Sequence, residues 1–114
     1  MSVGQYLTRR LEVWRTVTVD DGAGGQETTR VLQSTVRAKV DQPSATERLV
    51  AAQAGSRHSH DIWLLPSADV HRGDELQGTD TLGQAQRFRV LSVVQASRPV
   101  YSKVFAELLQ EEGA

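Results

Sequence analysis

Hydrophobic and polar residues alternate with a period of two along most of this chain. Between Leu11 and Val19 the odd positions hold mainly leucine and valine, whereas the even positions hold glutamate, tryptophan and threonine. Such alternation, rich in β-branched residues, is typical of half-buried strands rather than of helices. A helix is the competing prediction for Val104–Glu112. The pattern predicts seven strands, near residues 8–19, 26–33, 35–41, 58–65, 74–78, 87–95 and 99–109.

Turn residues separate these strands. The run Asp20–Gly25 holds three glycines and two aspartates, and Pro43, Pro66 and Pro99 each interrupt an alternating segment. Many short strands with regular turns predict an all-β fold, a small antiparallel β-barrel of six to seven strands. We expect a long loop or short helix between the third and fourth strands. Residues 1–114 then form a single β-barrel domain, with 110–114 as a flexible tail.

Residues 42–57 break the alternation. Ser44–Glu47 matches a capping box, helix-forming residues follow, and Gly55 stands where a glycine commonly ends a helix. The large apolar residues here are only Leu49 and Val50, too few to hold a helix firmly on a barrel. The segment is therefore either a short helix or a mobile excursion.

Composition and charge exclude several classes of protein. The chain has 114 residues, of which 39% are hydrophobic and 24% charged, and its net charge of −1 excludes a strongly basic nucleic-acid binder. It has no cysteine, which removes disulfides, thiolate zinc sites, iron–sulfur clusters and cysteine nucleophiles. No apolar signal-peptide core stands in the first ten residues, and no run approaches the ~18 apolar residues of a membrane span. We expect a soluble protein without a membrane partner.

Four short motifs resemble functional sites, and each has a simpler explanation. His58 and His60 form an H-x-H pair, but zinc needs further ligands, so we expect two surface histidines on one strand face. Ser59–Asp61 contains the residue types of a hydrolase triad, yet consecutive strand residues point to opposite faces. Arg72–Asp74 spells an adhesion tripeptide that a turn explains, and Gly22–Gly25 precedes no phosphate-binding helix. We expect no catalytic residue, no metal, no cofactor, and no hydrolase or nuclease activity.

Charge is distributed unevenly along the chain. The first forty residues carry six basic and four acidic side chains, whereas residues 61–78 carry four acidic side chains and one arginine. Oppositely charged ends suit self-association in a ring or the docking of a partner.

The order of these features resembles the head–tail joining proteins of tailed bacteriophages, also called head-closure, head-completion or stopper proteins. The resemblance covers roughly residues 6 to 110 and rests on the ordered set rather than on any single motif. The segments that carry it are Tyr6–Trp14, Asp21–Gly25, Val36–Val40, Ser44–Gln53, His58–Leu64, Gly73–Gly78 and Phe88–Val93.

The resemblance implies a structural virion protein that forms a ring below the portal, closes the DNA channel and docks the tail. The implied partners are other copies of the chain, the portal or a portal-bound adaptor, a tail terminator or tail-completion protein, and packaged DNA contacted without sequence specificity. The protein would reside at the head–tail connector, and in the host cytoplasm during assembly. The alternative is an OB-like barrel that binds single-stranded nucleic acid through exposed aromatic residues. The expected interface residues are Glu47, Arg48, Leu49, Val50, Gln53, Arg9 and Arg10.

Overall fold

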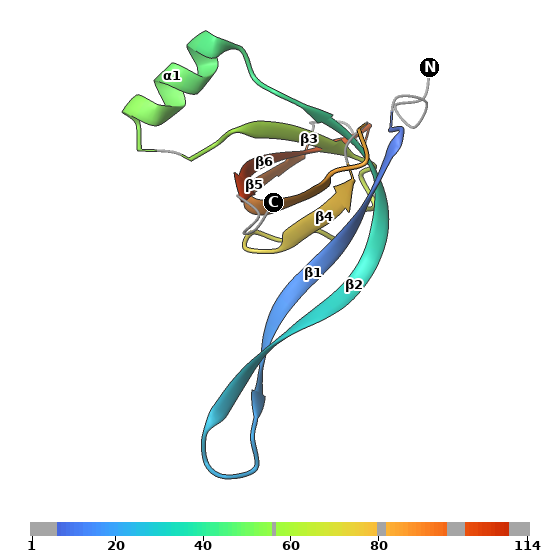
Figure 1. Ribbon diagram of the computed structural model, residues 1–114, viewed down its shortest axis with the longest axis vertical. Coiled ribbons are helices and arrows are strands. Elements are labelled where there is room, and N and C mark those ends of the chain that lie inside the picture. The colour runs from blue at the N-terminus through green and yellow to red at the C-terminus, as the bar shows by residue number, and fades with distance from the viewer. Residues whose placement is uncertain (1–6, 56, 80–81, 96–99, 110–114) are drawn as a thin grey trace.

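The computed structural model describes residues 7–55, 57–79, 82–95 and 100–109 (Figure 1). This part of the chain folds into six strands and one helix. The predicted flexible tail, residues 110–114, lies outside the described residues. The elements are β1 (Arg9–Asp20), β2 (Gln26–Asp41), α1 (Ala45–Gln53), β3 (His60–Leu64), β4 (Glu75–Thr79), β5 (Ala85–Gln95) and β6 (Ser102–Leu109).

The six strands close into an antiparallel barrel in the order β1-β2-β3-β6-β5-β4. The predicted all-β barrel is therefore confirmed. Closure pairs the two strands that would otherwise be the edges of an open sheet. The inward side chains alternate along each strand, as the period of two requires. The core consists of Leu11, Val13, Ala38, Ile62, Leu64, Val70, Leu76, Phe88, Val90, Val104 and Ala106.

β1 and β2 form a long hairpin that continues well past the barrel (Figure 1). β4 pairs with β1 only over Glu12–Trp14, and β3 pairs with β2 only over Ala38–Asp41. The distal part of the hairpin is therefore a ribbon of two strands without a third strand beside it. At its tip, Gly22 and Gly24 have φ angles of 79° and 82°, which glycine adopts without strain.

The structure corrects the predicted strand boundaries in one important place. Residues 26–33 and 35–41 were predicted as two strands, but they form the single strand β2. No turn separates them. Val13 pairs with Ser34 and Trp14 with Leu32, so Gln33 is an extra, bulged residue of β2, and the pairing with β1 continues on both sides of it. The barrel therefore has six strands, and the excursion joins β2 to β3.

Other boundaries differ by a few residues. The predicted strand at 58–65 begins at His60, and the one at 99–109 begins at Ser102. The competing helix at the C-terminal end is wrong for its described part, because β6 continues to Leu109. None of the described helices is long and apolar enough to cross a membrane.

An ion pair fastens the base of the hairpin to the barrel. Arg15 Nε and Nη2 donate to the two carboxylate oxygens of Asp74 at 3.0 and 2.9 Å. Asp74 is only 3% exposed, and it also accepts a hydrogen bond from the His71 amide at 2.9 Å. The acidic residue of the Arg72–Asp74 tripeptide is thus engaged inside the protein, in agreement with the turn interpretation.

Candidate interaction surfaces

α1 stands away from the barrel on the connection between β2 and β3 (Figure 1). Ser44 caps its N-terminus, since the Ser44 Oγ accepts a hydrogen bond from the Glu47 amide at 3.2 Å. Gly55 ends it with a φ of 79°. The helix alternative is thus confirmed, and of the predicted capping box the structure shows the hydrogen bond from the Glu47 amide to Ser44. α1 buries none of its side chains, and within the described chain no strand Cα atom lies within 8 Å of the helix.

The five predicted interface residues of this segment lie together on α1. Leu49 and Val50 are 59% and 60% exposed and stand next to each other, so they form one apolar patch. Gln53 follows them by four and three residues, so the three share one face of the helix. Glu47 and Arg48, also exposed, precede them by one turn or less. The arrangement is a small apolar patch beside polar residues.

The other two predicted interface residues, Arg9 and Arg10, lie on opposite faces of β1. Arg9 Nη2 donates at 2.8 Å to the carbonyl oxygen of Thr79 and at 2.8 Å to Gln86 Oε1, so this guanidinium ties β1 to the end of β4 and the start of β5. Arg10 is exposed on the opposite face of β1. Arg10 is therefore the more accessible of the two for a partner.

His60 is a core residue, not the surface histidine that the sequence suggested. It is 6% exposed, and its ring lies edge-on to Phe88 with the centroids 5.1 Å apart. Burial lowers the pKa of the His60 imidazole, and its neighbours His58, Arg9 and Arg48 lower it further. The prediction was wrong because the strand places position 60 toward the barrel interior.

His58 lies on the outside of the barrel and has its own partners. Its Nε2 is 2.6 Å from Asp61 Oδ1, and its ring lies edge-on to Phe105 at 4.8 Å. The second carboxylate oxygen of Asp61 is 3.7 Å from Lys103 Nζ. Because β3 begins only at His60, the two imidazoles do not share a face. Among the residues that the structure describes, no three potential metal ligands come together.

The Ser59–Asp61 triplet does not form a hydrolase triad. Ser59 Oγ is 3.0 Å from His60 Nδ1, but it also accepts a hydrogen bond from the Leu108 amide at 2.7 Å. The Asp61 carboxylate contacts His58 rather than His60. No carboxylate therefore orients the His60 ring, as a triad requires.

Sequence reasoning missed a cluster of aromatic residues on the outer face of β3 and β6. The Trp63 and Tyr101 rings lie edge-on with centroids 4.8 Å apart, and Lys103 Nζ lies 4.8 Å from the Trp63 ring and 5.0 Å from Phe105. Alternation at positions 101, 103 and 105 could have indicated this face. The rings pack on one another and on Lys103, so they do not form the open stacking platform of a single-strand-binding barrel.

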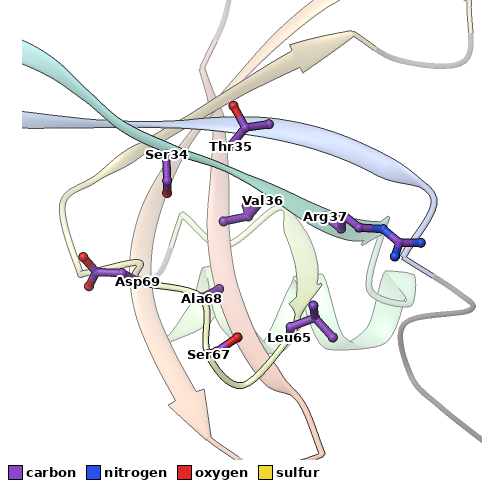
Figure 2. A pocket seen from close by; sticks show the side chains of 8 residues that line it. All are labelled: Ser34, Thr35, Val36, Arg37, Leu65, Ser67, Ala68 and Asp69. Atoms are coloured by element: carbon purple, nitrogen blue, oxygen red, sulfur yellow. The ribbon is translucent and has the colours of Figure 1, made fainter.

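A groove of about 370 Å³ lies between β2 and the loop that follows β3 (Figure 2). β2 contributes the stretch Ser34–Arg37, just before its pairing with β3 begins at Ala38. The loop contributes Leu65 and Ser67–Asp69. Hydroxyl and small apolar side chains dominate the lining, so the groove offers contact surface rather than acid–base chemistry.

The described residues form a closed six-stranded barrel from which α1 and the distal part of the β1–β2 hairpin project (Figure 1). The family model for phage head completion proteins matches residues 1–109, and the chain belongs to this family. It is thus a structural phage protein of the virion, with a role in joining head and tail.

Comparison with solved structures confirms the fold. The solution structure of protein SF1141 from Shigella flexneri 2a superimposes with a TM-score of 0.72, covering 99% of this chain and 98% of that one. The two sequences are 16% identical, so the similarity concerns the fold alone. No curated protein sequence matches the chain.

Proposed function

We propose that this protein forms a ring below the portal, where it closes the DNA channel and docks the tail. The observation that supports this proposal best is α1, which carries Leu49 and Val50 more than half exposed and has no packing partner among the described strands. A nine-residue helix gains little stability alone, so a packed partner is the natural state for its apolar residues.

Burial of these side chains supplies a measurable part of the assembly energy. Fully burying one leucine or valine is worth roughly 1.5–3 kcal/mol. A ring repeats the contact once per subunit, so a small patch suffices for stable assembly. Glu47 and Arg48 supply a polar rim beside this patch, and Gln53 extends the same helical face. Arg10 adds a second exposed contact on β1.

The partners in this proposal are those that a head–tail joint brings together. They are neighbouring copies of the chain, the portal or a portal-bound adaptor on the head side, and a tail terminator or tail-completion protein on the tail side. Packaged DNA passes through the channel without sequence-specific contacts. Assembly takes place in the host cytoplasm, and the finished ring belongs to the head–tail connector.

The substitution Leu49→Asp tests the role of α1. Since Leu49 is 59% exposed, an aspartate there should leave the free barrel as stable as the wild type. It should block joining, because the interface would bury an unpaired carboxylate. Particles assembled with this variant are assayed for retained DNA by nuclease protection and for attached tails by electron microscopy.

Leu82→Asp is the matched control, because Leu82 is 83% exposed and lies outside α1. This control should give particles that retain DNA and carry tails. The proposal fails if Leu49→Asp particles also do so, or if both variants block joining equally.

A further inference from the structure

A second groove of the barrel is lined by three arginines. Arg57, Arg72 and Arg89 surround a hollow of about 400 Å³ whose remaining lining includes Leu91 and the backbone of Gly73. The three arginines come from the segment before β3, the turn before β4, and β5. We call this hollow the arginine groove. All three arginine residues are exposed to solvent.

The positive charge of the arginine groove is only partly neutralised within the chain. Arg57 Nε lies 4.0 Å from a carboxylate oxygen of Glu107, at the limit of an ion pair, and the Arg57 side chain is 81% exposed. Glu107 also lies opposite Arg89 in the β5–β6 ladder, so this one carboxylate faces two of the three arginines. Glu75 lies opposite Arg89 in the β4–β5 ladder, but its carboxylate is already 2.8 Å from Arg30 and 3.5 Å from Arg87. The groove is therefore suited to a carboxylate-bearing segment.

The tip of the β1–β2 hairpin has the opposite charge. Asp20, Asp21 and Glu27 are exposed there, and no basic residue stands between Val17 and Thr29. The turn is internally ordered, because Asp21 Oδ1 accepts hydrogen bonds from the amides of Ala23 and Gly25 at 2.8 and 3.1 Å. We call residues 20–27 the acidic tip. It presents three carboxylates on a preformed turn.

The acidic tip does not reach the arginine groove of its own chain. β1 continues through Arg15–Asp20 after its pairing with β4 ends, which carries the tip roughly 20 Å outward at about 3.3 Å per residue. In Figure 1 the tip lies at the far end of the molecule from α1, whereas Gly55, at the end of α1, lines the arginine groove. A paired two-stranded ribbon does not fold back on itself, so the tip that fits this groove belongs to another copy.

We propose that the acidic tip of one copy docks in the arginine groove of the next. This contact joins two different surfaces of the same chain, and a head-to-tail contact closes into a ring when the rotation between copies permits. The inference rests on the proposed ring and assigns the surfaces through which neighbouring copies meet. A DNA phosphate backbone could also satisfy arginines, but the chain offers its own complementary segment, and its net charge of −1 gives no general attraction for a polyanion.

Disulfide cross-linking tests this contact directly, because the natural chain has no cysteine. A chain with Glu27→Cys and Arg72→Cys carries one thiol on the acidic tip and one in the arginine groove, while Asp20, Asp21 and the other two arginines remain. The chain is oxidised mildly both in assembled particles and as concentrated purified protein. We expect a ladder of covalent oligomers on a non-reducing gel, because each copy links to the next.

Two controls show whether the ladder depends on the contact between the acidic tip and the arginine groove. Glu27→Cys alone should stop at dimers, and Glu27→Cys with Arg37→Cys should give about tenfold less of the higher oligomers, because Arg37 lies on β2 outside the arginine groove. Adding Arg89→Gln to the first double variant should also reduce the ladder. High salt should weaken the ladder of the purified protein, since it screens exposed charges.

The absence of a ladder from both preparations, or equal ladders for the 27–72 and 27–37 pairs, overturns the inference. A third outcome also overturns it: duplex DNA binds the wild type, Arg72→Glu weakens that binding, and no ladder forms. The groove would then be a DNA contact. These outcomes are distinct from failure of the proposed function, which Leu49→Asp reports: particles that lack the ladder but still depend on Leu49 refute the tip–groove contact alone.

Discussion

Replacing Asp74 with alanine should loosen the hairpin from the barrel. The Asp74 carboxylate is 3% exposed, accepts two hydrogen bonds from Arg15 at 3.0 and 2.9 Å, and accepts a third from the His71 amide at 2.9 Å. Asp74→Ala removes all three bonds at once. It also leaves the Arg15 guanidinium beside a cavity, with Asp69 at 3.7 Å as the nearest remaining carboxylate.

The size of the effect follows from these contacts. A hydrogen bond to a charged group is worth roughly 1.5–3 kcal/mol, and breaking a buried ion pair by removing one partner costs about 3–5 kcal/mol. The Arg15 side chain is 21% exposed and regains some water, which places the loss at the lower end of that range. We expect the free energy of unfolding to fall by about 3 kcal/mol. For a domain of this size, that corresponds to a melting temperature roughly 12 °C lower.

Urea unfolding followed by tryptophan fluorescence and circular dichroism measures this loss. Asp41→Ala is the matched control, because the Asp41 carboxylate lies 3.3 Å from Lys39 Nζ in an ion pair whose side chains are 43% and 48% exposed. An exposed pair of this kind contributes less than about 1 kcal/mol. If Asp74→Ala lost no more stability than Asp41→Ala, the Arg15–Asp74 pair would not be what holds the hairpin to the barrel.

Three further predictions concern the barrel and the helix. The lowered pKa of His60 means that the native state binds fewer protons than the unfolded state, so the free energy of unfolding should fall as the pH drops below about 6.5; His60→Gln should reduce this dependence, and identical pH profiles would exclude His60 as its source. Gly78→Ala should cost about 1–3 kcal/mol in urea unfolding, because the added Cβ would lie 2.8 Å from the backbone oxygen of Arg10; wild-type stability would contradict this packing. In the free chain, the amides of Ala45–Gln53 should exchange with deuterium faster than that of Ile62, because α1 has no packed face; equally slow exchange would show that α1 is already held against a partner.

Several features of this protein follow from short stretches of sequence. The alternation from Leu11 to Val19 indicated a strand, and β1 spans Arg9–Asp20. The N-cap serine at position 44 and the glycine at position 55 bracketed the helix correctly. These predictions succeed because they depend on interactions between residues a few positions apart, which a sequence displays directly. The continuity of β2 was missed for the complementary reason: it depends on pairing with β1, where an extra residue keeps the ladder intact.

The tertiary structure alone decides which segments meet. Arg15 and Asp74 are 59 positions apart, and nothing in the sequence around either residue indicates the other. Closure of the barrel buries His60, and it brings Arg57, Arg72 and Arg89 around one groove. Periodicity therefore determined that this chain would form strands with one buried face each. The order in which those strands close, and with it the surfaces offered to partners, depends on filling a common core with side chains from all six strands, a condition that no local segment contains.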